Sequence, residues 1–375
     1  MPKLMILYAR YGDGHLQAAH ALRDSFARHG IGEVKLVDLL AESHPMLNEV
    51  SRFVYYKSYT VWPKMYGWVY QATKTMKPGS LFSQWLHSFG AERLTRLIRQ
   101  EQPDAVIHTF PMMVLPMIAR RIGRRIPMYN VVTDFDLHMR WVHPAVNKYY
   151  VATEDLRQEM IRLGIPQQRI AVTGMPIRFS FAPGRCPAED ARRFGLDPNR
   201  PIVLVMAGAA GVLAGTRELC KRLTEDGGVQ AALVCGRNRN LETSLRRQFA
   251  GSGNVSVFGY VDEIDKLMGI ASCIVTKSGG LTCSEAIAAG LPIFLYRPVP
   301  GQERNNALYL QAKGAAAICR SPGEMAGAVR ALLSDPARRE AMRTAVDALR
   351  RDGAADRIAL DIMHDLPIMV KEPIL

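Results

Sequence analysis

The stretch from Lys277 to Asn306 holds the residue types best suited to chemistry, and it reads KSGGLTCSEAIAAGLPIFLYRPVPGQERNN. It follows an apolar run of strand length and then opens a predicted helix near Thr282. Amides at the start of a helix attract anions, and glycines let a ligand approach the backbone closely. The sequence therefore predicts an anion site, suited to a diphosphate, formed by Gly279, Gly280 and the first amides of the helix.

Polar side chains that suit a nucleoside and a sugar follow in the same stretch. Glu285 is expected in the first turn of the helix, where its carboxylate can bind both hydroxyls of a ribose. Gln302 and Glu303 come after the next predicted strand and offer donors and acceptors for sugar hydroxyls. Together these positions predict a nucleotide-sugar site at neighbouring strand ends. The alternative is that they form ordinary helix caps and loops.

A histidine near the start of the chain suits acid–base chemistry. The first apolar run leads into Gly12, Gly14 and His15, where a helix is expected to begin. Gly14 lets the backbone approach the donor, and the imidazole could accept a proton from an incoming hydroxyl at neutral pH. Asp134, after the fourth predicted strand, could orient His15 or the hydroxyl, or cap the next helix. His15 could instead cap or pack the helix start.

Arg178, Gly208 and Gly211 are further candidates for contact with phosphate. An arginine at the expected domain boundary can reach a diphosphate through charge-assisted hydrogen bonds, or it is an ordinary surface residue. Gly208 and Gly211 belong to a small-residue turn, GAAGV, that suits close backbone contact with phosphate or sugar. The turn lacks the Lys-Ser/Thr pair of a P-loop, so it does not indicate ATP hydrolysis.

Aromatic and basic side chains alternate between residues 50 and 99. Trp62, Lys64 and Trp68 are typical members of this segment. The composition suits a surface that binds anionic lipid, although it could also stack on nucleic-acid bases or form an ordinary amphipathic helix pair. Trp141, further along the chain, either shapes the acceptor site or packs in the core.

Twelve apolar runs of strand length must position these residues, and helix-like segments separate the runs. Such alternation indicates parallel sheets covered on both faces. The series restarts after the proline-rich stretch Pro176–Asp197, which predicts a linker. We therefore expect an α/β protein of two Rossmann-like domains that face one another across a cleft. The expected strands are 4–9, 33–39, 105–110, 128–133, 149–153, 169–173, 202–207, 229–235, 255–258, 273–276, 293–296 and 316–319.

The whole chain has a globular composition with a strong positive charge. Its 375 residues suffice for two domains, and the formal net charge of +13 favours anionic partners. None of the six cysteines forms a Cys-x-x-Cys pair, so zinc spacing is absent and reduced cytosolic thiols are expected. The sequence shows no signal peptide and no apolar run of spanning length, so we expect any membrane contact to be peripheral.

The sequence resembles the GT-B glycosyltransferases of the monogalactosyldiacylglycerol synthase and processive diacylglycerol glucosyltransferase family. Transferases that add N-acetylglucosamine to the lipid-linked peptidoglycan precursor are more distantly similar. The resemblance covers most of the chain, and its last motif is the most specific. The motifs are YGDGHLQAAHAL, TDFDLHMRWVHP, KYYVATEDL, TGMPIRFSF and KSGGLTCSEAIAAGLPIFLYRPVPGQERNNA.

This resemblance implies an inverting transfer of glucose or galactose from a UDP-sugar to diacylglycerol, which yields a β-glycosyl diacylglycerol glycolipid. It implies His15 as the base for the acceptor hydroxyl and Glu285 as the ribose ligand. No metal or other cofactor is implied, because helix amides and basic side chains neutralise the leaving diphosphate. The remaining implied ligands are Gln302 and Glu303 for the sugar, Ser278, Gly279, Gly280 and Thr282 for the diphosphate, and Tyr260 and Val261 for uracil. The GAAGV turn departs from the longer Gly/Ser-rich loop that relatives often carry.

The expected organisation follows from these motifs. Residues 1–176 would form a domain that binds acceptor and membrane, and residues 177–354 a domain that binds UDP-sugar, with a helix in 355–375 packing back on the first. We expect a peripheral protein on the cytoplasmic face of the cell membrane. Its expected partners are UDP-sugar, diacylglycerol and anionic lipids, with no nucleic acid. The alternatives are a UDP-sugar epimerase, a transferase to another lipid-linked acceptor, and a non-catalytic binding protein.

Overall fold

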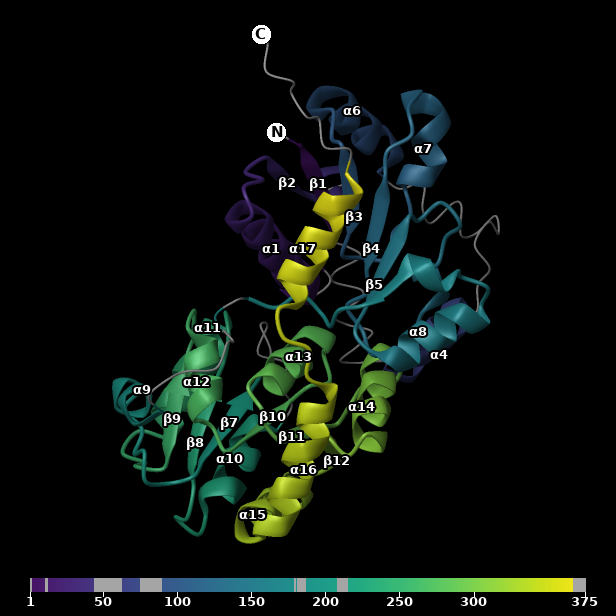
Figure 1. Ribbon diagram of the computed structural model, residues 1–375. Coiled ribbons are helices and arrows are strands. Elements are labelled where there is room, and N and C mark those ends of the chain that lie inside the picture. The colour runs from purple at the N-terminus through teal and green to yellow at the C-terminus, as the bar shows by residue number, and fades with distance from the viewer. Residues whose placement is uncertain are drawn as a thin grey trace. The chain divides into compact units, whose positions relative to one another are not determined.

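The computed structural model describes residues 2–10, 13–43, 63–74, 90–178, 180, 187–207 and 215–366 (Figure 1). The chain forms two compact units. Unit 1 contains residues 1–179 and 353–375, and unit 2 contains residues 180–352. The chain therefore crosses between the units twice, close to the boundaries expected at 176/177 and 354/355.

Unit 1 is built on one sheet of six parallel strands in the order β2-β1-β3-β4-β5-β6. The order reverses between β1 and β3, because the chain moves outward from β1 in one direction and then returns to build the other half. In such sheets ligands bind beyond the carboxyl ends of the strands at this reversal. The strands are β1 (Leu4–Tyr8), β2 (Val34–Asp38), β3 (Ala105–His108), β4 (Met128–Val131), β5 (Lys148–Val151) and β6 (Ile170–Val172).

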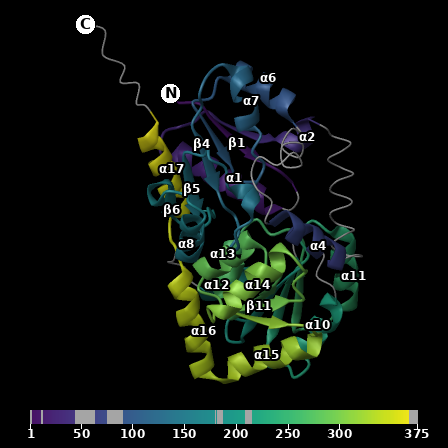
Figure 2. The ribbon, with the colours of Figure 1, turned by 90° about the vertical axis from the view of Figure 1, so that its right-hand side faces the viewer.

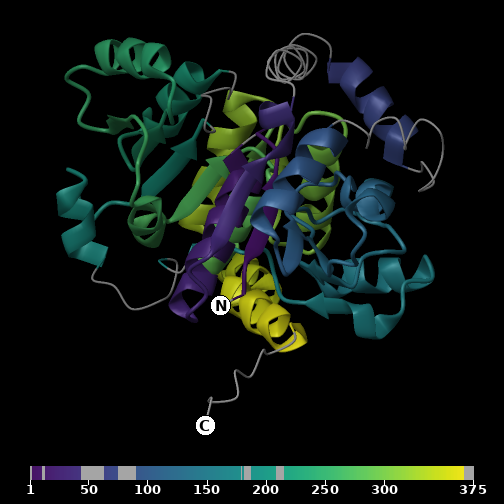
Figure 3. The same cartoon turned by 90° about the horizontal axis from the view of Figure 1, so that it is seen from above.

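The first and last helices of unit 1 pack together on one face of this sheet (Figures 1 and 3). Phe26 of α1 and Ile362 of α17 join Ile6 in one buried cluster. Met5 and Val106 point to the other face and are buried as well, so both faces are covered. The helices are α1 (Asp13–Arg28), α2 (Leu39–Ser43), α4 (Pro63–Lys74), α6 (Ala91–Glu101), α7 (Leu115–Ile122), α8 (Glu154–Arg162), α17 (Ala354–Asp365) and the short 3-10 turns η1 (Met139–Trp141) and η2 (Gln167–Arg169).

Two carboxylates on α17 fix it to the rest of unit 1. The Asp356 carboxylate accepts hydrogen bonds of 2.5 Å from the Ser25 hydroxyl and 2.7 Å from the Arg28 guanidinium. One turn further on, the Asp361 carboxylate accepts bonds of 2.7 Å from both Lys148 Nζ and the Tyr150 hydroxyl. The returning helix is thus held by apolar packing and by charge-assisted hydrogen bonds.

Unit 2 repeats the same plan with a sheet in the order β12-β11-β10-β7-β8-β9. Its strand order reverses between β7 and β10, which directs attention to the loops after these two strands. The strands are β7 (Ile202–Met206), β8 (Gln230–Val234), β9 (Val255–Phe258), β10 (Cys273–Thr276), β11 (Ile293–Tyr296) and β12 (Ala316–Cys319). The helices are α9 (Pro187–Arg193), α10 (Thr216–Thr224), α11 (Arg239–Gln248), α12 (Ile264–Ile270), α13 (Gly280–Ala288), α14 (Gln302–Ala312), α15 (Pro322–Ser334) and α16 (Pro336–Leu349).

All twelve expected strands are present, and the prediction of two Rossmann-like α/β domains is confirmed. The last four strands of the chain have the predicted ends. In unit 1 the predicted strands run one or two residues too far, because residues such as Thr109 and Thr133 leave the ladder for loops. Within the described ranges, no helix is long and apolar enough to cross a lipid bilayer.

Candidate functional site

His15 lies where the strand order of unit 1 reverses. It belongs to the first turn of α1, directly after β1, and its Nδ1 is 2.7 Å from the carbonyl oxygen of Thr109, which follows β3. The Thr133 hydroxyl, after β4, is 3.0 Å from the same nitrogen. The Phe110 ring packs edge-on against the imidazole, with the ring centroids 5.0 Å apart. The loops after two neighbouring strands, β3 and β4, therefore fix the orientation of His15.

The contact with Thr109 decides which nitrogen of His15 carries the proton. A carbonyl oxygen only accepts hydrogen bonds, so Nδ1 must donate and Nε2 keeps its lone pair. Burial lowers the pKa of His15 to about 4, against a smaller opposing effect of the bond to Thr109. The imidazole is therefore neutral at physiological pH, with Nε2 available to accept a proton.

Asp134 and Trp141 were also singled out in unit 1. Asp134 is buried beside Thr133, and the contacts described for the His15 ring come from Thr109, Thr133 and Phe110. Trp141 is 1% exposed and its carbonyl accepts a hydrogen bond of 2.7 Å from Asn130, which favours the packing alternative.

Helix α4 is clamped to the loop that follows β4. Lys74 Nζ lies 2.7 and 2.8 Å from the two carboxylate oxygens of Asp136, and the Tyr70 hydroxyl donates to the same carboxylate at 3.2 Å. The Thr73 hydroxyl is 3.3 Å from His138 Nε2. Trp68, on the outward side of this helix, is 73% exposed. The clamp therefore joins a helix with an exposed tryptophan to the loop after β4, in which Thr133 contacts His15.

In unit 2 the starts of helices α13 and α14 are joined at the ends of two paired strands, β10 and β11. The Ser278 hydroxyl donates a 2.6 Å hydrogen bond to the Glu303 carbonyl. The Asn306 side-chain amide donates a 3.1 Å bond to the Ser278 carbonyl. Ser278 and Asn306 are both completely buried. The Ser278 side chain thus joins the two helices, which leaves its backbone, rather than its hydroxyl, for contact with a phosphate.

The start of α13 has open space for a ligand. Gly279 is the N-cap, and no side chain caps the helix at this position. A Cβ added at Gly279 would meet no protein atom within 4 Å, and its φ of −67° is ordinary for any residue. Glycine is therefore required neither by the backbone conformation nor by protein packing, which suits the approach of a bound phosphate to the helix amides.

Two acidic residues of the predicted donor site are held in low-polarity surroundings. Glu285 is 8% exposed and lies in the second turn of α13, because the helix begins at Gly280; the expected first-turn position is wrong. Burial raises the pKa of Glu303 to about 7, although the Val299 amide donates to its carboxylate at 3.3 Å. Burial also lowers the pKa of Lys277 to about 8.

The remaining predicted positions are spread over both units. Tyr260 is 45% exposed after β9, and the Arg237 guanidinium stacks 4.7 Å from its ring centroid, while Val261 is half-buried. Gly14 lies in α1, and Gln302 and Thr282 are half-buried in their helices. Arg178 is half-buried beside the first crossing into unit 2. Trp62, Gly208, Gly211 and the Lys64 side chain lie outside the described residues.

Sequence reasoning missed three groups of the site. The Thr109 carbonyl has no sequence signature, because every residue carries a backbone carbonyl. Thr133 stands directly before the singled-out Asp134, and its place at a strand end could have marked it. Arg237 follows β8, the strand paired with β9, so its approach to Tyr260 depended on knowing the strand order.

Comparison with known proteins places these residues in a family. Residues 15–177 match the family described as monogalactosyldiacylglycerol (MGDG) synthase, and residues 202–358 match the glycosyltransferase family 28 C-terminal domain. The chain is 40% identical over 380 residues to the processive diacylglycerol beta-glucosyltransferase of Bacillus mycoides, covering 100% of this chain and 98% of the relative. The Bacillus thuringiensis protein of the same name is 39% identical over 365 residues, covering 97% of this chain and 94% of the relative.

Solved structures agree in fold. They include a Staphylococcus aureus MnaA–UDP structure (TM-score 0.63, 14% identity, 100% and 99% of the two chains) and a glycosyltransferase from Rickettsia africae (0.56, 12%, 97% and 98%). A UDP-GlcNAc 2-epimerase from Neisseria meningitidis has a TM-score of 0.59 at 15% identity, covering 96% and 100%. At these identities the likeness shows the GT-B fold alone. The full-length similarity to the Bacillus proteins goes further: this chain belongs to the family of processive diacylglycerol β-glucosyltransferases.

Proposed function

We propose that this chain transfers a hexose, glucose in the first place, from a UDP-sugar to diacylglycerol with inversion at the anomeric carbon. The observation that carries the proposal is the joined start of α13 and α14: open space at Gly279 lies at the start of the helix that carries the buried Glu285, and Ser278 bonds to the Glu303 carbonyl. Anion-binding amides beside buried acceptors suit a diphosphate with a ribose on one side and a sugar on the other. The names of the full-length relatives support diacylglycerol as acceptor and a β-glucoside as product.

The acceptor side of the proposed reaction depends on His15. Nε2 removes the proton of the diacylglycerol hydroxyl while the oxygen attacks the anomeric carbon of the donor. The bond from that carbon to the UDP oxygen breaks, and its electron pair leaves with UDP. The imidazolium that forms is stabilised because its Nδ1–H already donates to the Thr109 carbonyl. Asp134 would act on the same side, by orienting the base or the hydroxyl.

The donor side depends on the described start of α13 and on residues around it. The backbone at Ser278, Gly279, Gly280 and Thr282 would hold the diphosphate, and the helix start would stabilise its charge as UDP leaves. Glu285 would bind the ribose, and Gln302 and Glu303 the sugar. Arg178, Gly14, Gly208 and Gly211 would add contacts to phosphate, and Tyr260 with Val261 would hold uracil. On this scheme the leaving group needs no metal ion.

A membrane contact completes the proposal, because diacylglycerol resides in bilayers. Trp68 is exposed on α4, and exposed tryptophan suits the boundary between headgroups and acyl chains. Together with Trp62 and Lys64, it would hold the chain peripherally against anionic lipid on the cytoplasmic face of the membrane. The clamp between Lys74 and Asp136 would then link this contact to the loop beside His15.

A matrix of donors and acceptors tests the proposal. Purified protein is incubated with UDP-glucose or UDP-galactose, and with diacylglycerol in phosphatidylglycerol-containing vesicles or with a polyprenyl phosphate acceptor. We expect a β-glucosyl diacylglycerol only in the reaction that contains UDP-glucose and diacylglycerol, with stoichiometric release of UDP. A product on the polyprenyl acceptor alone, or an epimerised UDP-sugar without acceptor, would contradict the proposed function.

A further inference from the structure

Six arginine side chains form an exposed surface on helices α6 and α7 and on the loop that follows α7. We call this surface the arginine face, and all its members are exposed: Arg96, Arg99, Arg120, Arg121, Arg124 and Arg125. The two helices lie side by side in Figures 1 and 2. The Arg99 guanidinium donates a 3.0 Å hydrogen bond to the Arg121 carbonyl at the end of α7. This bond brings the carboxyl ends of both helices, and the charges they carry, onto one surface.

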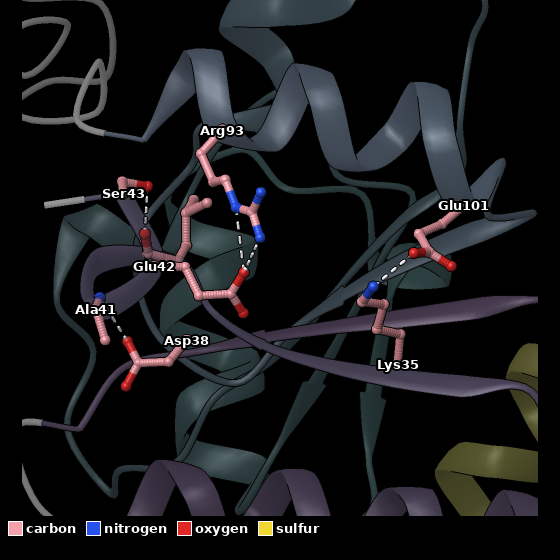
Figure 4. Close-up of polar contacts among 8 residues, drawn as sticks. Lys35, Asp38, Ala41, Glu42, Ser43, Arg93 and Glu101 are labelled. Carbon is pink, nitrogen blue, oxygen red and sulfur yellow. Dashed lines mark hydrogen bonds and ion pairs between the residues drawn. The ribbon is translucent and has the colours of Figure 1, made fainter. Parts of the chain in front are cut away.

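Three acidic side chains near these helices have other partners: Glu42 and Glu101 pair with cations, and Asp104 accepts from a backbone amide. Figure 4 shows Glu42 paired with Arg93 at 2.8 Å and Glu101 paired with Lys35 at 2.5 Å. The Asp104 carboxylate accepts a 2.7 Å bond from the Lys3 amide. In the part of the chain that the structure describes, no member of the arginine face has an acidic partner. Six neighbouring positive charges repel one another, so an anionic partner would stabilise this surface.

The sequence concentrates its positive charge in this part of unit 1. Residues 50–125 contain twelve Lys and Arg residues and three Asp and Glu residues. This stretch therefore supplies nine of the thirteen net positive charges of the chain. The net positive charge is therefore concentrated in one stretch of the sequence rather than spread evenly along it.

The arginine face lies away from the catalytic edge of the sheet. Arg124 and Arg125 directly precede β4, which begins at Met128, so they lie at the amino-terminal edge. His15 lies at the carboxyl-terminal edge, after β1. The arginine face is therefore not part of the proposed acceptor or donor site.

We propose that the arginine face binds the phosphate groups of anionic lipids and is a second membrane contact besides α4. Guanidinium groups bind phosphate oxygens in pairs, and basic residues near a bilayer are attracted by its negative surface potential. Met117, also on α7, is 38% exposed and suits the boundary of a bilayer. Neither helix carries an aromatic side chain on which a nucleic-acid base could stack, which disfavours RNA as the partner. The inference rests on the proposed function only in that a lipid acceptor brings the chain to a bilayer.

Vesicle binding tests the arginine face with a matched control. The test variant is R96Q/R120Q/R121Q/R125Q, which spares Arg99 and Arg124 because their side chains bond to backbone carbonyls. The control, R239Q/R247Q/R338Q/R343Q, removes the same charge from exposed arginines of unit 2. Partitioning is measured by co-sedimentation with phosphatidylcholine vesicles, with and without phosphatidylglycerol. We expect the test variant to bind phosphatidylglycerol vesicles at least about 100-fold more weakly than wild type, and the control to stay near wild type.

Three outcomes would overturn the inference. The test variant could bind as well as wild type, the two variants could lose binding equally, or the test variant could lose binding to single-stranded RNA while its vesicle binding stays intact. Activity on a short-chain diacylglycerol in neutral detergent micelles separates this inference from the proposed function. The test variant should keep wild-type activity in these micelles. If the wild-type protein were inactive on every diacylglycerol, the proposed function would be wrong, but the vesicle-binding result would still test the arginine face.

Discussion

The orientation of His15 determines which of its ring nitrogens can act as the base. Because Nδ1 donates to the Thr109 carbonyl, only Nε2 can accept the proton of the acceptor. His15→Ala should lower kcat by about 10²–10⁴-fold and leave the affinity for UDP unchanged, because the His15 side chain is not among the proposed contacts to UDP. Steady-state kinetics on diacylglycerol vesicles and calorimetry with UDP measure the two effects. A kcat near that of wild type would remove His15 from the role of base.

The low pKa of His15 adds a dependence on pH. An ordinary histidine would become protonated as the pH falls through about 6.5 and would lose its capacity to act as a base. Burial lowers the pKa of His15 to about 4, so its base form persists down to that region. We therefore expect no loss of activity attributable to His15 between pH 8 and about pH 5. A profile of kcat/KM for diacylglycerol that falls with a midpoint near 6.5 would contradict this.

A substitution at Gly279 should affect ligand binding with little effect on folding. An added methyl group would meet no protein atom within 4 Å, so Gly279→Ala should cost unliganded stability no more than about 1 kcal/mol, the usual effect of alanine at an N-cap. The methyl group would instead occupy space proposed for the diphosphate. We expect at least roughly tenfold weaker UDP binding, since a steric conflict at a helix start also weakens the amide contacts. Unchanged affinity in calorimetry would place the diphosphate elsewhere.

Glu303 should make donor binding sensitive to pH. Burial raises its pKa to about 7, so its carboxyl is protonated below that value and ionised above it. An ionised carboxylate accepts hydrogen bonds from sugar hydroxyls more strongly than a protonated one. UDP-glucose should therefore bind more tightly at pH 8 than at about pH 6, whereas Glu303→Gln should bind it equally at both. UDP itself, without the sugar, is the control ligand, and an equal change for both ligands would refute the role of Glu303.

At the scale of elements, the clamp between α4 and the loop after β4 is the most specific contact. Lys74 and Asp136 are 24% and 18% exposed, so water screens their attraction only in part. Removing one partner leaves the other charge partly buried. We expect Lys74→Met and Asp136→Asn each to lower the free energy of unfolding, with the double variant losing at least about 1 kcal/mol less than the sum of the two. Additive losses in urea unfolding would mean that the pair does not interact.

The sequence predicted the elements better than the contacts between them. Each strand of unit 2 from β9 to β12 has the predicted ends, because Gly, Pro or polar residues bound a short apolar run on both sides, except before β12, where Ala315 precedes the strand. The helix α13 begins at Gly280, two residues before Thr282, which moves Glu285 from the first turn to the second. The links from Ser278 to Glu303 and from His15 to Thr109 were not predictable, since both end on backbone carbonyls. Such groups are identical in every residue, and only the fold selects one of them.

At the scale of the whole molecule, each unit has its own reversal of strand order and its own proposed ligand. A donor that binds unit 2 should stabilise unit 2 more than unit 1, because a ligand stabilises the folded state of the part to which it binds. We expect UDP to slow amide hydrogen exchange in residues 277–306 and to leave the strands of unit 1 unchanged. Exchange measured by mass spectrometry with and without UDP would show this. Protection confined to unit 1 would reverse the assignment of donor and acceptor.

The chain crosses between the units at 179/180 and 352/353, and this has a consequence for the exchange of whole units between related proteins. Residues 180–352 form one uninterrupted cassette inserted into unit 1, whose own last helix is held by Asp356 and Asp361. A chimera that takes this cassette from a relative with another sugar donor needs two junctions, and the second lies between α16 and α17. Recombination in this family could therefore change the donor while the acceptor unit, with its returning helix, passes on intact.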